Sequence, residues 1–448
     1  MTNSEQKYYN SKIETMSADE VVAIQLGKLK NQLIYINNHA PFYTNKFTNI
    51  SAHPKDIRTL EDLAKLPFTE KSELRQSQIE HPPLGSHAAA SMSDVVRVHA
   101  SSGTTGTPSF VGITKFDKQR WIECIARSYW AQGLRPEHIF AMGMSIGFFV
   151  GGLPISNVVE EIGATLLPIG TGASDRLISS IRSMGATTLA TTPSYATYLA
   201  EIAREKMGVD TADLGIKHVF VGAEPGGGIP EVRALIESEW NAKCTESIGN
   251  ADVITIHSAE CEEQDGCHFI VPDYLIMEII DPDTGLVVSL DQLEIEGEMV
   301  FTHLDRQCNP MLRFRTRDRV VIKNTPCGCG RTGPRLKCIG RSDDMLIVRG
   351  VNVWPSAIKD VVMSFIPEIS GEMRIILDAP GPKVNPPLII KVEKGTGSTT
   401  SPDIAERIES ELRAKLIFAA KIELVPHGTI PRTEMKAKLI EHDYNQDN

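Results

Sequence analysis

The chain has 448 residues, of which 41% are hydrophobic and 23% charged, so two or three soluble domains are expected. A formal net charge of −11 at pH 7 argues against a nucleic-acid backbone or an anionic membrane as the main partner. No apolar run follows the first residues, so we expect no secretory signal. We expect a cytoplasmic protein instead. The eight cysteines then indicate metal ligands or free thiols rather than disulfides.

Residues 1–80 are expected to be mainly helical and polar. Apolar residues recur at roughly helical spacing between Ile24 and Ile36, and Pro41 ends that helix. Further along, the uncharged stretch Ile139–Val159 approaches the length of a membrane span. Its glycines and Pro154 instead favour a buried strand followed by a glycine-rich loop.

Two predicted strands, 95–100 and 110–114, flank a loop of hydroxyl and glycine residues. Its members are Ser101, Ser102, Gly103, Thr104, Thr105, Gly106, Thr107 and Pro108. Glycines let backbone N–H groups converge on an anion and hydroxyls add donors, so the loop is a candidate phosphate grip. No Gly-Lys-Ser/Thr follows, which excludes the common nucleotide P-loop. An ordinary polar turn is the alternative.

Residues 115–250 alternate helix and strand, which predicts a largely parallel sheet with helices on its faces. Helices are expected at 117–132 (capped by Asp117), 175–184, 194–206 and 230–240, and strands at 165–169, 188–193 and 218–222. Ligands bind at the carboxyl ends of such strands. We expect the 101–107 loop and the turn 222–225 to lie there.

Residues 270–340 are rich in strands and predict an antiparallel sheet or barrel, after which strands and helices mix from about residue 342. Ser401 and Pro402 are expected to cap and begin a helix. That helix places four apolar residues on one face: Ile404, Ile408, Leu412 and Leu416.

Five segments occur in a specific order along the chain. They are 99–114, Thr191-Thr192-Pro193-Ser194-Tyr195, Gly222-Ala223-Glu224-Pro225, Arg313-Phe314-Arg315-Thr316-Arg317-Asp318, and 340–353. Together they resemble the phenylacetate–CoA ligase family of adenylate-forming enzymes, over nearly the whole chain from Thr15 to Lys438. Each motif is weak alone, whereas their combined order is highly specific.

The resemblance implies an α/β fold with two domains. A large N-terminal adenylation domain, residues 1–341, would combine parallel-rich sheets and helices with a strand-rich part. A small mobile α+β domain, residues 342–448, would follow a hinge at Asp343 or Asp344. The family joins a carboxylic acid to ATP, and CoA then attacks the acyl-adenylate. The implied partners are therefore an acid, ATP, CoA and Mg²⁺, and the implied assembly is a homodimer.

The resemblance also implies roles for single residues. Ser101 to Thr107 would hold the β- and γ-phosphates, and Gly222 to Pro225 would line the adenine pocket. Asp318 would bind the ribose hydroxyls, and Arg341 would reach the same ribose or a phosphate. Asp252 would bind Mg²⁺, because a hard cation accepts a carboxylate. Lys436, with Lys438 as the near alternative, would balance charge between the acid and the α-phosphate. The non-catalytic alternatives are a helix-capping acid for Asp252, a surface ion pair for Asp318 and Arg341, and a solvated lysine for Lys436.

The chain departs from the family pattern in the phosphate loop and the acyl pocket. Thr107 stands where lysine is common, and Lys115 is a weak candidate to replace that charge. The acyl pocket would be lined by Met144, Ile146, Gly147, Phe148, Tyr195, Ile248 and Gly249. Met144, Ile146 and Ile248 stand where phenylacetate-type enzymes have aromatic residues. The acid could therefore be another aryl acid or a small branched or hydroxylated aliphatic acid.

A second group of residues has the chemistry of a zinc site. Zinc takes four Cys or His ligands, commonly in two close pairs, and Cys261, His268, Cys327 and Cys329 make such a set. His257, Cys267 and Cys308 are candidate replacements. The alternative is buried, reduced cysteines, the role expected for Cys124, Cys244 and Cys338.

Three functions are compatible with these patterns. An AMP-forming acid–CoA ligase is the first. An adenylation enzyme that loads a carrier protein shares every adenylation motif and differs only in the acceptor. A zinc-bearing binding protein without activity is the third, which Asp252, Asp318 and Lys436 argue against.

Overall fold

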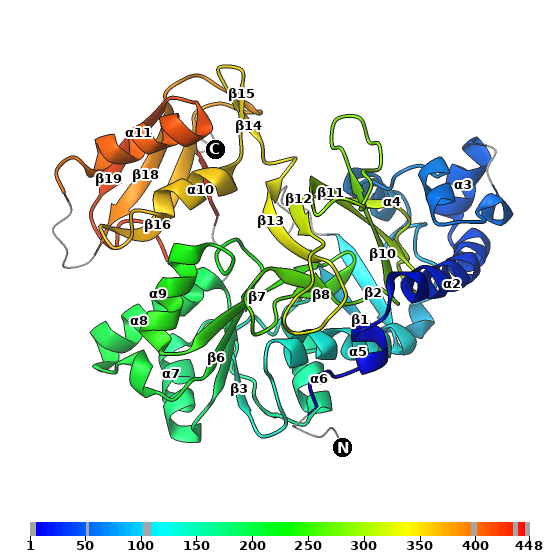
Figure 1. The fold of residues 1–448 in the computed structure, drawn as a ribbon, viewed down its shortest axis with the longest axis horizontal. Coiled ribbons are helices and arrows are strands. Elements are labelled where there is room, and N and C mark those ends of the chain that lie inside the picture. The colour runs from blue at the N-terminus through cyan, green and yellow to red at the C-terminus, as the bar shows by residue number, and fades with distance from the viewer. Residues whose placement is uncertain (1–5, 51–52, 102–108, 396–400, 433–437, 444–448) are drawn as a thin grey trace.

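The computed structural model describes residues 6–50, 53–101, 109–395, 401–432 and 438–443. Its centre is an 11-stranded sheet with the strand order β10-β11-β12-β13-β9-β8-β7-β6-β5-β3-β4 (Figure 1). A 3-stranded and a 4-stranded sheet, both built from residues after Arg341, lie apart from it. The α/β class expected from the sequence is therefore confirmed.

One half of the large sheet is parallel. Its strands are β3 (Ile139–Met142), β4 (Thr165–Leu167), β5 (Thr188–Thr191), β6 (His218–Gly222) and β7 (Lys243–Asn250). The connecting helical segments are α6 (Leu153–Ile162), α7 (Ser174–Met184), α8 (Pro193–Met207), η4 (Thr211–Asp213) and α9 (Pro230–Trp240). Buried apolar strands alternating with helices produce this arrangement, as the sequence predicts for 165–240.

The other half of the sheet is antiparallel. Its strands are β8 (Ile254–Ala259), β9 (Cys267–Phe269), β10 (Leu275–Ile280), β11 (Glu294–His303), β12 (Phe314–Lys323) and β13 (Arg335–Arg341). The antiparallel pairing expected for 270–340 is therefore confirmed, and these strands belong to the large sheet rather than to a barrel, because β8 pairs with the edge of β7 and continues that sheet.

The N-terminal part is mostly helical. Its elements are α1 (Ser11–Glu14), α2 (Ala18–His39), α3 (Pro41–Asn49), η1 (Pro54–Asp56), η2 (Glu61–Lys65), α4 (Lys71–Glu80), η3 (Met92–Asp94), β1 (Val95–Ala100), β2 (Phe110–Thr114) and α5 (Lys115–Ala131). The strands β1 and β2 form their own two-stranded sheet. The two strands predicted to flank the 101–107 loop are therefore confirmed, and they lie outside the parallel sheet; the loop's residues 102–108 lie outside the described residues.

Two predicted helix starts are also wrong. Helix α5 begins at Lys115 because the Thr114 hydroxyl accepts from the Asp117 N–H, so Asp117 is the third helical residue rather than the cap. Helix α11 (Ile404–Leu416) begins two residues later than expected, with Asp403 at the N-cap position. The Ser401 hydroxyl donates to the Asp403 carboxylate, so this serine stabilises the cap residue instead of the first helical turn.

Residues after the large sheet form a C-terminal unit. Its elements are β14 (Leu346–Val348), β15 (Val351–Val353), α10 (Pro355–Met363), β16 (Ile369–Leu377), β17 (Lys383–Val384), β18 (Leu388–Lys394), α11, β19 (Ala420–Val425) and β20 (Ile440–His442). The unit lies over α8 and α9 (Figure 1). Among the described residues, no helix is both long and apolar enough to cross a membrane.

Candidate active site

A hydrogen-bonded chain of polar side chains lies at the foot of the predicted phosphate loop. The hydroxyls of Ser101 and Ser109, which bracket the loop, are 2.8 Å apart. The Ser109 hydroxyl donates to Asp252 over 3.1 Å, and Lys71 Nζ donates to the other oxygen of that carboxylate over 2.7 Å. Asp252 is 2% exposed. A buried carboxylate and an ammonium group therefore face the loop.

Lys71 pairs with a predicted site residue, and the sequence analysis missed it. It is the first residue of α4, where the positive end of the helix macrodipole disfavours a cation. The Asp252 carboxylate offsets that cost. A lysine at this position is the only signal in the sequence, and it names no partner, because Asp252 is 181 residues away.

The other predicted phosphate-loop residues, Ser102, Gly103, Thr104, Thr105, Gly106 and Thr107, lie outside the described residues. The predicted catalytic Lys436 does too. Lys438 is described and exposed.

The turn after β6 carries the four residues predicted to line the adenine pocket. Gly222 is buried against β7, and Ala223 has a φ of 72°, in the left-handed region. Glu224 accepts a hydrogen bond from the Ser194 N–H at the start of α8, over 2.9 Å. Pro225 is exposed, and its carbonyl accepts from Lys359 Nζ over 2.8 Å. The turn thus lies at the carboxyl end of a parallel strand, where ligands bind in this architecture.

Burial raises the pKa of a carboxyl group beside this turn. Glu246 on β7 faces Gly228, and a Cβ at Gly228 would lie 2.8 Å from its carboxylate. Burial, followed by the nearby Glu260 carboxylate, raises the pKa of Glu246 to about 7. Glu246 therefore gains and loses its proton near neutral pH, next to the predicted adenine pocket.

Asp318 and Arg341 lie side by side where β12 and β13 pair. Arg341 Nη1 donates to the Asp318 carboxylate over 3.0 Å, and its other nitrogens donate to Asp343 over 2.9 and 2.8 Å. Asp344 is 3.8 Å from Arg341. The two residues predicted to bind ribose are thus connected directly to the predicted hinge.

Three of the predicted acyl-pocket residues gather against one core cluster. They are Met144, Ile146 and Ile248, all half-buried. Gly249 is fixed by close packing, since a Cβ there would lie 1.6 Å from the Thr255 carbonyl oxygen.

The other predicted acyl-pocket residues lie elsewhere. Gly147 and Phe148 are exposed, and Phe148 lies edge-on to the Phe110 ring. Tyr195 is fully buried in a second core cluster, where its hydroxyl is 3.0 Å from that of Ser174.

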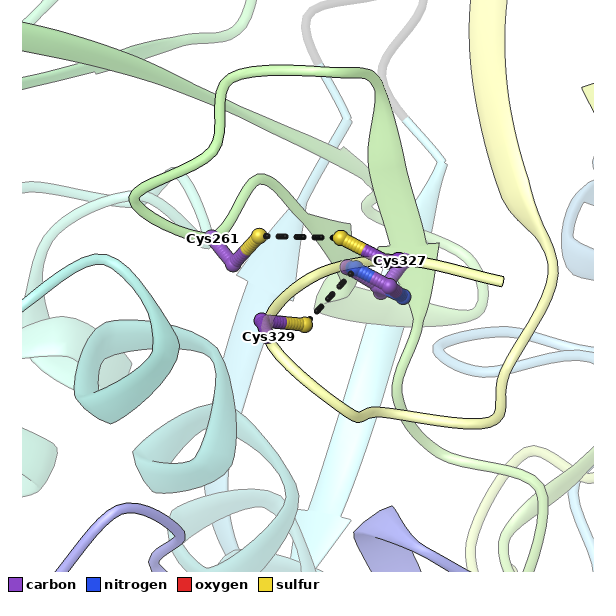
Figure 2. A group of neighbouring side chains, drawn as sticks. Cys261, Cys327 and Cys329 are labelled. Carbon is purple, nitrogen blue, oxygen red and sulfur yellow. Dashed lines mark hydrogen bonds between the residues drawn. The ribbon is translucent and has the colours of Figure 1, made fainter. Parts of the chain in front are cut away.

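The predicted zinc ligands come together in a single cluster. The ligand atoms of Cys261, His268, Cys327 and Cys329 all lie within 4.8 Å of one another. Figure 2 shows the three cysteine sulfurs converging, with Cys261 Sγ 3.7 Å from Cys327 Sγ. The loop after β8, the strand β9 and the β12–β13 connection supply these residues. Three sulfurs and one imidazole nitrogen are a donor set typical of structural zinc.

The hydrogen bonds around this cluster orient it for a metal. His268 Nδ1 lies 3.1 Å from the Gly333 carbonyl, which leaves Nε2 directed at Cys329 Sγ, 3.3 Å away. A carbonyl behind the ring is usual for metal-binding histidines. Hydrogen bonds from Cys261 and His268 lower the pKa of the Cys329 thiol. The Arg331 N–H also donates to the Cys329 sulfur, over 3.4 Å, so a thiolate is favoured at this position.

The three replacement ligands lie outside that cluster. His257 is buried on β8, where burial lowers its pKa to about 3. Cys267 Sγ is 3.5 Å from the Glu246 carbonyl, and Cys308 is fully buried. Cys124 and Cys244 are core residues as expected, and Cys338 is half-buried.

The cluster also holds the N-terminal segment. The Tyr8 hydroxyl donates to the Cys329 carbonyl over 3.0 Å, and Arg331 forms a 2.8 Å ion pair with buried Glu14. Gly330 has a φ of 77°, and a Cβ there would lie 2.5 Å from the Tyr8 hydroxyl. The turn between Cys329 and Arg331 therefore requires glycine in order to dock this segment.

Comparisons with known proteins agree over the whole chain. The chain is 34% identical to a phenylacetate-coenzyme A ligase of Thermus thermophilus, covering 95% of this chain and 97% of that protein. It is 33% identical to a phenylacetate-coenzyme A ligase of Escherichia coli (strain K12), covering 95% of both. Residues 350–443 match the family model of the AMP-binding enzyme C-terminal domain.

Solved structures resemble it equally widely. The crystal structure of a 2-hydroxyisobutyryl-CoA ligase in the postadenylation state, in complex with 2-HIB-AMP, superimposes with a TM-score of 0.91 at 30% identity. It covers 99% of this chain and 94% of the other. The structure of the same ligase with 2-HIB-AMP and CoA in the thioesterification state superimposes with a TM-score of 0.74 at 31% identity, with the same coverage. The C-terminal unit is therefore oriented more as in the first of these two structures than as in the second.

Proposed function

The chain belongs to the phenylacetate–coenzyme A ligase family, and on that premise we propose that it activates a monocarboxylic acid as its adenylate and transfers the acyl group to CoA. The observation that carries this proposal is the chain Lys71–Asp252–Ser109–Ser101 at the foot of the predicted phosphate loop. It combines a cation, a carboxylate and hydroxyl donors where ATP phosphates would bind.

In the first half-reaction, a carboxylate oxygen of the acid bonds to the α-phosphorus of ATP, and pyrophosphate leaves. Like charges must approach, so the protein has to supply positive charge and hydrogen-bond donors. Lys71 is suited to neutralise the leaving pyrophosphate. It could take this role here because Thr107, which stands where lysine is common in the family, carries no charge. We propose that the Lys436 ammonium lies between the acid's carboxylate and the α-phosphate and balances their negative charge.

We propose Asp252 as the residue that holds Mg²⁺. An aspartate with serine hydroxyls on one side has the hard oxygen chemistry that Mg²⁺ prefers, and the ion would neutralise charge on the phosphates. The Lys71 ammonium now satisfies one carboxylate oxygen. Lys71 would therefore pair with the buried Asp252 carboxylate before ATP binds, and with the ATP phosphates once Mg²⁺ binds Asp252.

Asp318 and Arg341 are proposed to hold the ribose. A carboxylate is a two-acceptor partner for the two ribose hydroxyls, and the Arg341 guanidinium orients it over 3.0 Å. Because Arg341 also binds Asp343, nucleotide binding is connected to the link between the two units. We place the domain boundary there, with residues 1–341 on one side and 342–448 on the other.

In the second half-reaction, the CoA sulfur bonds to the acyl carbon and AMP leaves with the former carboxylate oxygen. The C-terminal domain would rotate between the steps, about Asp343 or Asp344, and carry Lys436 away from the site. We also propose a structural Zn²⁺ held by Cys261, His268, Cys327 and Cys329, on the donor set and the hydrogen bonds that orient it.

The acid is proposed to be small and uncharged beyond its carboxylate. Met144, Ile146 and Ile248, each half-buried against the core, would give the pocket an aliphatic surface in place of the aromatic residues of phenylacetate-type enzymes. Such a surface suits a branched or hydroxylated aliphatic acid at least as well as an aryl acid.

A panel of acids tests the function. Acid-dependent AMP release from ATP is measured with and without CoA, using phenylacetate, hydroxylated and heterocyclic aryl acids, and short branched or hydroxylated aliphatic acids. We expect release that needs both CoA and one class of acid, with aliphatic acids ahead of phenylacetate. Exchange of pyrophosphate that ignores CoA would favour a carrier-protein acceptor, and no turnover with any acid would favour a binding protein.

Replacing Lys71 with glutamine is expected to lower kcat/KM for ATP by about tenfold to hundredfold, because a charged donor to the phosphates is lost. Steady-state kinetics with varied ATP measure this. Lys65→Gln is the matched control, because Lys65 is 66% exposed and pairs locally with Asp62. Equal kcat/KM in both variants would remove Lys71 from the site.

A further inference from the structure

Two of the contacts between the C-terminal unit and the large domain are polar and lie away from the link. Lys359 on α10, 8% exposed, donates to the Pro225 carbonyl in the predicted adenine turn. Arg432, which follows β19, lies 3.3 Å from the Glu201 carboxylate on α8. Figure 1 shows the unit lying above α8 and α9, where these contacts form.

Arg432 is held rigidly on its own side of this interface. Its Nη1 and Nη2 donate to the buried Glu393 carboxylate over 3.0 and 2.6 Å. Glu393 also accepts from the Ile430 N–H over 2.9 Å. A bidentate pair of this kind fixes the guanidinium plane, and Nε is left to reach across the interface to Glu201.

The rest of the interface leaves room for movement. A cavity of about 40 Å³ lies between the two units, lined by Ser194 and Thr197 of α8, Leu235 of α9, and Lys359, Glu372 and Arg374 of the C-terminal unit. Apolar side chains such as Val232 and Met363 share the lining with these polar groups, and the space among them is incompletely filled. The ion pair across the interface is therefore suited to hold this orientation without making it permanent.

Arg432 is the last described residue before the segment that contains Lys436. We propose that Glu201 is a positioning residue, which holds Arg432 and thereby holds the C-terminal unit in the described orientation, the one that serves adenylation. This inference rests on the proposed function and adds a residue to it. Glu201 touches no reacting atom. It stabilises the adenylation orientation, and the C-terminal domain must break the pair to admit CoA.

The expected size of the effect follows from exposure. The Glu201 side chain is 25% exposed and that of Arg432 is 12% exposed, and partly exposed pairs contribute about 0.2–1 kcal/mol. Glu201→Gln should therefore shift the equilibrium between the two orientations of the C-terminal domain by a factor of about 1.4–5. It should slow acid-dependent ATP–pyrophosphate exchange by that factor. Thioester formation from preformed acyl-adenylate, measured in a single turnover, should stay equal or become faster.

The matched control is Glu205→Gln, one turn further along α8, where the side chain is exposed. A readout without activity is hydrogen exchange at residues 420–432, which should speed up in Glu201→Gln and not in Glu205→Gln. Opposite effects on the two half-reactions together with faster exchange would support the proposal. Exchange equal to that of the control, or an equal fall in both half-reactions, would overturn it. Inactive wild-type protein would reject the ligase function, while hydrogen exchange would still decide the role of Glu201.

Discussion

Replacing Asp252 with asparagine is expected to slow acyl-adenylate formation by about a hundredfold to a thousandfold. The change removes the charge that would hold Mg²⁺ and leaves the Lys71 ammonium without its counter-ion. The amide can still accept from Ser109 and fills the same volume, so the fold should persist. Acid-dependent ATP–pyrophosphate exchange measures the rate, and a Mg²⁺ titration should show that more metal is needed.

The control for Asp252 is Asp283→Asn, at an exposed turn that follows β10 in the chain. It should leave both the exchange rate and the Mg²⁺ dependence unchanged. The melting temperature separates lost chemistry from lost structure. If Asp252→Asn retains exchange within about threefold of wild type, its role in metal and phosphate binding is refuted, since even one lost donor to a developing charge costs more.

Replacing Cys329 with serine is expected to release zinc and to lower the melting temperature by about 3–5 °C. A structural metal contributes directly to folding, and a loss of about 3–5 kcal/mol corresponds to a shift of that size in a chain of this length. The cluster joins the loop after β8, β9 and the β12–β13 connection, and through Tyr8 and Glu14 it holds the N-terminal segment.

Metal analysis of protein purified without chelators should give one zinc per chain, and none in the variant. Cys338→Ser is the control, because this half-buried cysteine lies outside the cluster and should keep the metal. Proteolysis near residue 16 should also become faster in Cys329→Ser, as the segment is released. Zinc-free wild-type protein whose melting temperature does not rise on adding zinc would contradict the proposed site.

Local patterns were sufficient to predict the parallel half of the sheet. Buried strands such as 218–222 and the helix 230–240 match β6 and α9, because apolar runs and flanking turns fix such elements. Helix starts were less reliable. Thr114 and Asp117 are both good capping residues, as are Ser401 and Asp403, and only the folded geometry shows which of two neighbours occupies the cap position.

Residue chemistry was sufficient to predict the four residues that lie together, Cys261, His268, Cys327 and Cys329, but it left three replacements open. The fold makes the choice: His257 lies inside the core on β8, whereas His268 on β9 faces the turn containing Cys327 and Cys329. Long-range pairs gave no local signal. Neither the Lys71–Asp252 pair nor the Glu201–Arg432 pair has a sequence pattern, because each joins segments more than a hundred residues apart.

The central claim is that the acid is activated through an acyl-adenylate before its transfer to CoA. The most direct measurement uses an accepted acid labelled with ¹⁸O in both carboxylate oxygens, with ATP and CoA, and mass analysis of the products. In adenylation one carboxylate oxygen bonds to the α-phosphorus, and thiolysis leaves that oxygen on AMP. We predict one labelled oxygen in AMP and one in the thioester. Unlabelled AMP alongside labelled thioester, or label in pyrophosphate, would contradict the adenylate route.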